Sequence, residues 1–407
     1  MFSRALHIRL RLTAFGFGLH HYNIRAMQVV FARMVRWRPP LLTSVAPSGW
    51  TLALMVGITL TAYLFSAVHQ QGSWLLAADW LDNGTYIAAS EAISTGRWST
   101  PTDTPTPFFG FPLVIAVVTQ ATALNEWATV IAISLLSALI TCTCLRRLYG
   151  APAVLSPFLL SWDWVGICVL GGSEAPFCAC LFVAFLCARG GRWRTAATLA
   201  AAATTIRPMG VFALLALFLT RIHHRAWRTS TEMTLLGLVI GAMYLALVGL
   251  LTGDPWINFR TYRVDWNTGW PVGPPFIALI HSSVPLFRRF EWWIGMRVMV
   301  VVAVTVAAGL HVAYRIVRGC WSLPEAEGTF AVLVVGFLLC YPFRNMAYEW
   351  PRFLIPAVPI LTAAHGSMLP NSRRFWWLVV LANAGFLSIA WMRVSAPPPE
   401  NRMLCVT

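Results

Sequence analysis

Two carboxylates, Asp79 and Asp82, stand three residues apart directly after the first long apolar segment of this 407-residue chain. Acidic residues are scarce here, because Asp and Glu together number only 15. A carboxylate beside a bilayer is costly to desolvate and usually has a function. Held near a substrate hydroxyl, it can accept the proton as a general base. This pair is therefore the first place where we expect chemistry.

The residues after the pair predict the helix that would position it. A short helix is expected from Thr85 to Ser94, with Asp82 near its N-terminus and Gly96 at its end. Glu91 lies on this helix and is a third carboxylate that could support a base. The simpler alternative is that Asp82 only caps the helix. Asn83-Gly84-Thr85 also forms a formal N-glycosylation sequon.

Arginines supply the complementary chemistry, because a guanidinium binds phosphate oxygens in a bidentate manner. Candidates that lie outside the predicted spans or at their outer edges are Arg207, Arg260, Arg263, Arg344 and Arg352. Arg207 precedes Pro208 inside an apolar region, where a broken helix would line a cavity. Arg352 could instead be an interfacial anchor, and Glu174 could cap a helix or pair with an arginine. Asp163 lies within a span, where an ionisable group is usually paired.

Composition defines the class of protein. The chain is 58% hydrophobic and only 11% charged, whereas soluble domains are about 25% charged. All 30 basic residues are arginines, and they fall in short clusters between apolar segments. This positive-inside distribution argues against a nucleic-acid partner despite the net charge of +15. The sequence predicts a polytopic all-α membrane protein that is in contact with membrane lipids.

Apolar segments of roughly 20 residues predict the membrane spans. With two short spans around Arg207-Pro208, about 11 transmembrane helices are expected, with the N-terminus in the cytoplasm and a long first extracytoplasmic loop. The segment 107–124 is read as a helix in the outer interface. The predicted organisation is a basic cytoplasmic arm at 1–50, a transmembrane domain at 51–394 and a short extracytoplasmic tail at 395–407. The full-length spans are expected near 51–68, 127–145, 153–171, 175–188, 232–251, 296–316, 329–343, 353–369 and 375–393.

No metal site or other cofactor is expected. The nine cysteines lie mostly inside apolar segments, and Cys142-x-Cys144 lacks a second pair of ligands. The outer loops hold no cluster of His and Asp residues. A lipid-phosphate leaving group does not strictly require a metal ion.

Several motifs, taken in order, resemble the GT-C superfamily of integral-membrane glycosyltransferases. Asp82-x-x-x-Tyr86 followed by Gly96 is similar to the first-loop motif of that superfamily. The later motifs are similar to the branch around the second mannosyltransferase of GPI-anchor assembly and its bacterial relatives, and the resemblance covers roughly residues 50–370. These motifs are Ser173-Glu-Ala-Pro-Phe177, Arg194-x-x-Ala197, Thr204-x-x-Arg207-Pro-x-Gly210, Gly253-Asp-Pro255 and Pro351-Arg-Phe-Leu-x-Pro356.

The resemblance implies an inverting transferase that uses a polyprenyl-phosphate-linked sugar, most simply mannose, and a lipid or glycan acceptor. It implies Asp82 as the catalytic base, supported by Asp79 or Glu91. The family often has an acidic residue directly beside this Asp, whereas Asp79 is three residues away, so the choice between the two stays open. Substrate-binding residues implied by the matching motifs are Tyr86, Glu174, Arg207, Asp254 and Arg352, and Arg263 joins them as one of the outer arginines. The expected location is a bacterial inner membrane, with the active site on the extracytoplasmic side.

Two other classes of function remain open from the sequence. Broken helices and buried arginines would also suit a transporter or flippase for a lipid-linked or anionic substrate. Such transporters commonly contain inverted repeats, and the two halves of this sequence show no convincing similarity. A scaffold subunit with a degenerate catalytic loop is the third alternative, since the Asp pair departs from the family pattern.

Overall fold

The computed structural model describes residues 49–79, 83–96, 107–262, 270, 272–289, 292–319, 325–343, 346–366 and 372–393. These residues belong to one compact unit, Leu42–Thr407. The predicted cytoplasmic arm lies almost wholly outside them, as does the predicted C-terminal tail, so both stay predictions. Within the described residues the regular elements are α-helices and no β-strand, which confirms the all-α class.

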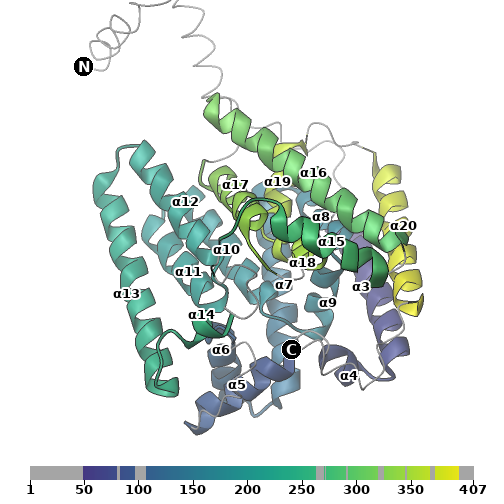
Figure 1. Cartoon of the computed structure of the whole chain (residues 1–407), viewed down its shortest axis with the longest axis horizontal. Helices are drawn as coiled ribbons and strands as arrows, with labels where there is room; N and C mark the ends of the chain where they lie inside the picture. Colours follow the sequence, from purple (N-terminus) through teal and green to yellow (C-terminus); the bar gives the residue numbers. More distant parts are fainter. Residues whose placement is uncertain are drawn as a thin grey trace, which may run out of the picture. The chain divides into compact units, whose positions relative to one another are not determined.

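Figure 1 shows the helices in the order in which they follow one another along the chain. Their bounds are α3 Gly49–Gln71, α4 Trp74–Asp79, α5 Asn83–Thr95, α6 Gly110–Thr122, α7 Glu126–Tyr149, α8 Ala151–Leu160, α9 Trp162–Leu170, α10 Glu174–Arg189, α11 Trp193–Ile206, α12 Gly210–His223, α13 Trp227–Thr252, α14 Ile257–Tyr262, α15 Ile277–Arg289, α16 Trp292–Val317, α17 Glu325–Cys340, α18 Met346–Phe353, α19 Val358–Ala364 and α20 Arg373–Arg393. Helix α5 confirms the helix predicted after the Asp pair, and Gly96 follows its end with a φ of +64°.

Four described helices are long and apolar enough to cross a membrane. They are Gly49–His69, Glu126–Tyr149, Trp227–Thr252 and Gly295–Val317, and the bent pair α8–α9 would make a fifth. By length and composition these helices make the chain an integral membrane protein. The predicted count of about 11 is not confirmed, and three other apolar helices, Gly110–Thr122, Gly210–His223 and Ala326–Cys340, are shorter than a full span. The predicted interfacial segment at 107–124 contains one of these shorter helices, α6.

Two predicted spans are broken in the structure. The segment 153–171 is divided into α8 and α9, which meet at an angle of 98°. Ser161 is extended at the break, and its hydroxyl caps α9 by accepting a hydrogen bond from the Trp164 N–H at 3.2 Å. The segment 353–369 contains the end of α18, a turn and the short α19. Pro356 lies in this turn and Pro359 in the first turn of α19, which fits the break because proline donates no backbone hydrogen bond.

The break predicted at Arg207-Pro208 is confirmed. Helix α11 ends at Ile206, and Arg207 takes the extended conformation that a residue before proline prefers, with φ −144° and ψ 134°. The chain then turns into α12 at Gly210. A Cβ at Gly210 would lie 2.4 Å from the Thr204 nitrogen, so only glycine lets α12 start this close to α11. Arg207 is thus fixed at the junction of two packed helices.

Helix α10 lies at the centre of the core. Most of its residues are buried, among them Phe177, Phe182 and Phe185, and it packs against both α7 and α11. In Figure 1, α11, α12 and α13 run side by side, while α3 and α20 pair at the other edge of the unit. The first residue of α10 is Glu174, so the core helix begins with a charged side chain.

Candidate functional site

Glu174 begins α10 after a glycine turn that only glycine readily adopts. Gly171 and Gly172 have φ values of +105° and +155°. Ser134 of α7 holds this turn, because its hydroxyl donates to the Gly172 carbonyl at 3.1 Å and accepts from the Gly172 N–H at 3.0 Å. The Glu174 side chain is only 2% exposed. The turn therefore delivers a carboxylate to the interior, where it needs partners.

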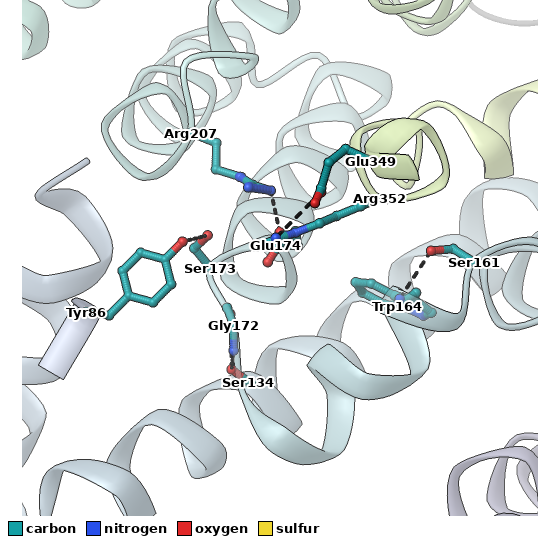
Figure 2. A network of polar contacts seen from close by, with 10 residues as sticks. All are labelled: Tyr86, Ser134, Ser161, Trp164, Gly172, Ser173, Glu174, Arg207, Glu349 and Arg352. Carbon is teal, nitrogen blue, oxygen red and sulfur yellow. Dashed lines mark hydrogen bonds and ion pairs between the residues drawn. The ribbon is translucent and has the colours of Figure 1, made fainter. Parts of the chain in front are cut away.

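Two arginines from distant helices meet this carboxylate (Figure 2). Arg207 Nη1 lies 2.6 Å from Glu174 Oε1, and Arg352 Nε donates a hydrogen bond to the same oxygen. The arginine side chains are 16% and 14% exposed. Two guanidiniums and one carboxylate leave an excess of one positive charge in this trio. Charge-assisted contacts of this kind are stronger than neutral hydrogen bonds.

Two further acids approach Arg352. Glu349 lies one turn earlier on α18, with Oε2 3.6 Å from Arg352 Nη1 (Figure 2). Asp163 of α9 interacts electrostatically with Glu349, Arg352 and Glu174. The in-span Asp163, for which the sequence predicts a paired environment, therefore belongs to the surroundings of the trio. Helices α9, α10 and α18, together with the α11–α12 junction, bring these charges together.

Helix α5 is joined to the same turn. The Tyr86 hydroxyl lies 2.9 Å from the Ser173 hydroxyl, directly before Glu174, and its ring packs edge-on against Phe111. Asn83, at the start of α5, is fully buried, and its Nδ2 donates to the carbonyls of Ala78 and Leu170 at 2.8 and 3.0 Å. Because this nitrogen is buried and hydrogen-bonded, the sequon at Asn83 is unsuited to glycosylation in the folded protein. The first loop is thereby fixed at both Asn83 and Tyr86.

The other predicted site residues fall into two groups. Asp82 and Arg263 lie outside the described residues, and for Asp79, the last residue of α4, only the backbone is described. Glu91 is exposed on α5. Asp254 is paired with Arg260 at 3.2 Å in the turn after α13, and its Oδ1 accepts from the Trp256 N–H at 3.0 Å. Among the described contacts, none brings Glu91 or Asp254 to the trio.

A second network ties the start of α6 to α13 and α14. Asn258 Nδ2 donates to the Pro107 carbonyl at 2.7 Å, and Tyr244 donates to Asn258 Oδ1 at 2.8 Å. Tyr244 also accepts from the Phe109 N–H at 3.2 Å. The next residue, Gly110, lies so close to α11 that a Cβ there would be 2.6 Å from backbone atoms of Thr205. These contacts place the residue run 107–110 against the turn that carries Arg207.

Sequence reasoning missed parts of this arrangement. It proposed Glu174, Arg207, Arg352 and Tyr86 as separate residues, and the structure brings them to one place. It did not select Glu349 or Ser173. The i, i+3 spacing of Glu349 and Arg352 was the available signal, because such pairs face each other on a helix. Among the described residues, no group of three or more His, Cys, Asp or Glu side chains could hold a metal ion.

Comparisons with known proteins give a single structural likeness to report. No protein-family model and no curated protein matches the sequence. Among solved structures, the chain is similar to ArnT from Cupriavidus metallidurans bound to undecaprenyl phosphate, with 19% sequence identity and a TM-score of 0.49. The matched region covers 83% of this chain and 63% of that protein, so this chain spans less than two thirds of its length.

Proposed function

We propose that this protein is a membrane glycosyltransferase of the GT-C type. It moves a sugar from a polyprenyl-phosphate-linked donor to a lipid or glycan acceptor. The observation that carries the proposal is the convergence of Arg207 and Arg352 on Glu174, next to the first-loop helix that follows Asp82. The order of the sequence motifs, which resemble those of that superfamily, supports it independently.

The arginines suit the leaving group of this reaction. When the bond between sugar and phosphate breaks, negative charge develops on the phosphate, and fixed cations stabilise it. A guanidinium carries five N–H donors in a plane, and the contact of Arg207 with Glu174 is made by one nitrogen. In the proposal Glu174 holds both guanidiniums in place before the donor arrives. Preformed geometry of this kind lowers the reorganisation needed during reaction.

The chemical step needs one base and no redox partner. Asp82 takes the proton of the acceptor hydroxyl while the hydroxyl oxygen attacks the anomeric carbon of the sugar. The bond from that carbon to the phosphate oxygen breaks, and polyprenyl phosphate leaves. Attack from the face opposite to the leaving group inverts the anomeric centre. Asp79 or Glu91 supports the base, and Tyr86, Asp254 and Arg263 complete the proposed substrate-binding set.

Mannose as the sugar follows from the resemblance of the later motifs to mannosyltransferases. An active site on the extracytoplasmic side of a bacterial inner membrane follows from the distribution of arginine clusters. Both belong to the proposal. Labelling tests the second directly, because Thr85 on α5 is exposed while the neighbouring Asn83 is buried. A Thr85→Cys variant should react with an impermeant maleimide added from outside, and reaction only from the cytoplasm would refute the assigned side.

A transfer assay tests the reaction. The purified full-length protein is given radiolabelled polyprenyl-phosphate-mannose and candidate lipid or glycan acceptors, and the wild type is compared with Asp82→Asn and Asp79→Asn. Transfer by the wild type and its loss only in Asp82→Asn supports Asp82 as the base. An Asp82→Asn variant as fast as the wild type refutes that role. Movement of the lipid across the bilayer without transfer would favour the transporter alternative.

Kinetics test the phosphate site separately. Arg207→Gln and Arg352→Gln should each weaken donor use, seen as a higher KM or a lower kcat, while leaving acceptor affinity unchanged. Arg374→Gln is the matched control, since Arg374 is an exposed arginine on α20. Equal effects of all three substitutions would mean that the trio has no special relation to the donor phosphate.

A further inference from the structure

Positive charge is concentrated where α10 ends, α11 begins, α12 ends and α13 begins, which is outside the proposed active site. Helix α11 begins at Trp193 and ends next to Arg207, so its 14 residues separate the two places by roughly 20 Å. Between residues 190 and 232 the sequence has a single acid, Glu232. The arginines near it, Arg192, Arg194, Arg221, Arg225 and Arg228, form what we call the basic corner.

Direct contacts hold the basic corner together. The Arg221 guanidinium lies 4.6 Å from the centre of the Trp193 ring, which joins the end of α12 to the start of α11. Arg194 forms two hydrogen bonds of 3.0 Å with Glu232, which joins α11 to α13. Glu232 is therefore occupied, and Arg228 also reaches it at 3.4 Å. The basic corner therefore contains five arginines and one glutamate. The side chains of Arg192, Arg194, Arg225 and Arg228 are exposed.

The turn after α10 and the turn after α12 have the same pattern of backbone hydrogen bonds. After α10, the Gly191 N–H bonds to the Ala188 carbonyl and the Arg192 N–H to the Cys187 carbonyl. After α12, the Arg225 N–H bonds to the Ile222 carbonyl and the Ala226 N–H to the Arg221 carbonyl. Both patterns are Schellman motifs, in which one residue adopts the left-handed conformation.

The two turns differ in the residue at that left-handed position. The first turn has Gly191, with a φ of +74°, and the second has Arg225, with a φ of +57°. An L-residue with a side chain is strained in this conformation, and glycine avoids the strain. Folding alone would therefore favour glycine at 225. A strained residue kept where the fold prefers another indicates a role for its side chain.

The surroundings of the turn indicate the partner. Helix α12 exposes Val211, Leu215 and Leu219 on one side. Helix α13 exposes Leu235, Leu238, Val239 and Met243. Both helices therefore carry exposed apolar side chains along the length that extends away from the basic corner. Trp227, 61% exposed, lies at the start of α13, where an interfacial anchor belongs. A cluster of arginines next to an exposed apolar surface matches a lipid, which has an anionic headgroup and apolar chains, better than a free anion. Figure 1 shows the α12–α13 turn at one end of these paired helices.

We propose that the basic corner binds the phosphate headgroup of an anionic phospholipid, whose acyl chains lie along α12 and α13. Arg225 and Arg228 contact the headgroup, and Arg192 adds charge from the neighbouring turn. Each arginine near an anionic surface strengthens such binding. This site is separate from the proposed donor site.

The test uses the full-length protein in nanodiscs of phosphatidylcholine, with or without phosphatidylglycerol of the same acyl chains. Thermal unfolding followed by tryptophan fluorescence gives Tm, and native mass spectrometry gives the retained lipid. The wild type should gain Tm and retain phosphatidylglycerol. The Arg225→Gly/Arg228→Gln variant should bind it more weakly, by on the order of tenfold. The Arg225→Gly variant in phosphatidylcholine alone should unfold at or above the wild-type Tm, because the strain is removed.

The matched control is Arg318→Gln/Arg374→Gln, which removes two exposed arginines, one directly after α16 and one on α20. It should keep the selectivity for phosphatidylglycerol. Equal loss in this control would show general attraction to a charged surface and overturn the proposal. No preference for phosphatidylglycerol in the wild type would overturn it too. An equal gain in Tm from inorganic phosphate in detergent would show a simple anion site rather than a lipid site.

Discussion

Arg352 donates from its Nε to Oε1 of Glu174, a residue 178 positions earlier in the chain. This contact joins α18 to the start of the core helix α10. Arg207 reaches the same oxygen at 2.6 Å from the α11–α12 junction. One carboxylate thus fixes two cations from different parts of the chain. The loss of its charge should therefore weaken the positioning of both guanidiniums.

Glu174→Gln should therefore lower stability strongly. The amide keeps the volume of the side chain but removes the carboxylate that Arg207 contacts and leaves Arg352 with the more distant Glu349, at 3.6 Å. Breaking a buried pair in this way costs roughly 3–5 kcal/mol. Added phosphate should restore part of the lost Tm, because an anion replaces the missing charge. Thermal unfolding with and without phosphate measures both effects. Glu232→Gln is the control, since Arg194 in that pair is 70% exposed, and its Tm should change little.

Gly110→Ala should change the position of Arg207 indirectly, through Thr205. The new Cβ would lie 2.5 Å from the Thr205 hydroxyl oxygen and 2.6 Å from Thr205 backbone atoms, so α6 or the end of α11 must shift. Overpacking of this kind costs about 1–3 kcal/mol, and donor use should fall further than stability alone explains. Gly241→Ala, whose Cβ would meet nothing within 4 Å, should keep wild-type kinetics. Unchanged kinetics in Gly110→Ala would contradict the argument.

The features that the sequence predicted correctly have local causes. The break at Arg207-Pro208 follows from the preference of a residue before proline, and the end of α5 follows from Gly96. The bend at Ser161 could not be predicted in this way, because Ser161 also fits inside an apolar segment. Nor could the partners of Glu174, since Arg352 and Arg207 meet it only after α10, α11 and α18 have packed. Local sequence identifies breaks and charges, while tertiary packing decides which charges meet.

The contact between Tyr86 and Ser173 should couple α5 to the Glu174 turn. Tyr86→Phe removes a hydrogen bond of 2.9 Å but keeps the ring against Phe111, so stability should fall by about 0.5–1.5 kcal/mol. Ser173→Ala removes the other partner. If the two hydroxyls act through each other, the double variant should lose less than the sum of the single losses. Strict additivity in Tm and in transfer rate would show that the contact is incidental.

The opposite end of α10 holds a second ion pair, which should matter for folding but not for the donor. Arg189 binds both carboxylate oxygens of Glu327, at 2.8 and 2.7 Å, and its Nη1 donates to the Leu148 carbonyl at 2.8 Å. Glu327 is 2% exposed and Arg189 28%. Glu327→Gln should therefore destabilise toward the lower end of roughly 3–5 kcal/mol, because the remaining exposure lets water solvate part of the guanidinium.

Replacing both partners separates the charge from the packing. In Arg189→Met/Glu327→Met no buried charge is left alone, and such replacements are often neutral or stabilising, so most of the lost Tm should return. The 16 residues of α10 place this pair roughly 22 Å from Glu174, so the KM for the donor should equal that of the wild type. A double variant less stable than Glu327→Gln would show that the ion pair itself stabilises α10. A changed KM would show that the two ends of α10 are coupled.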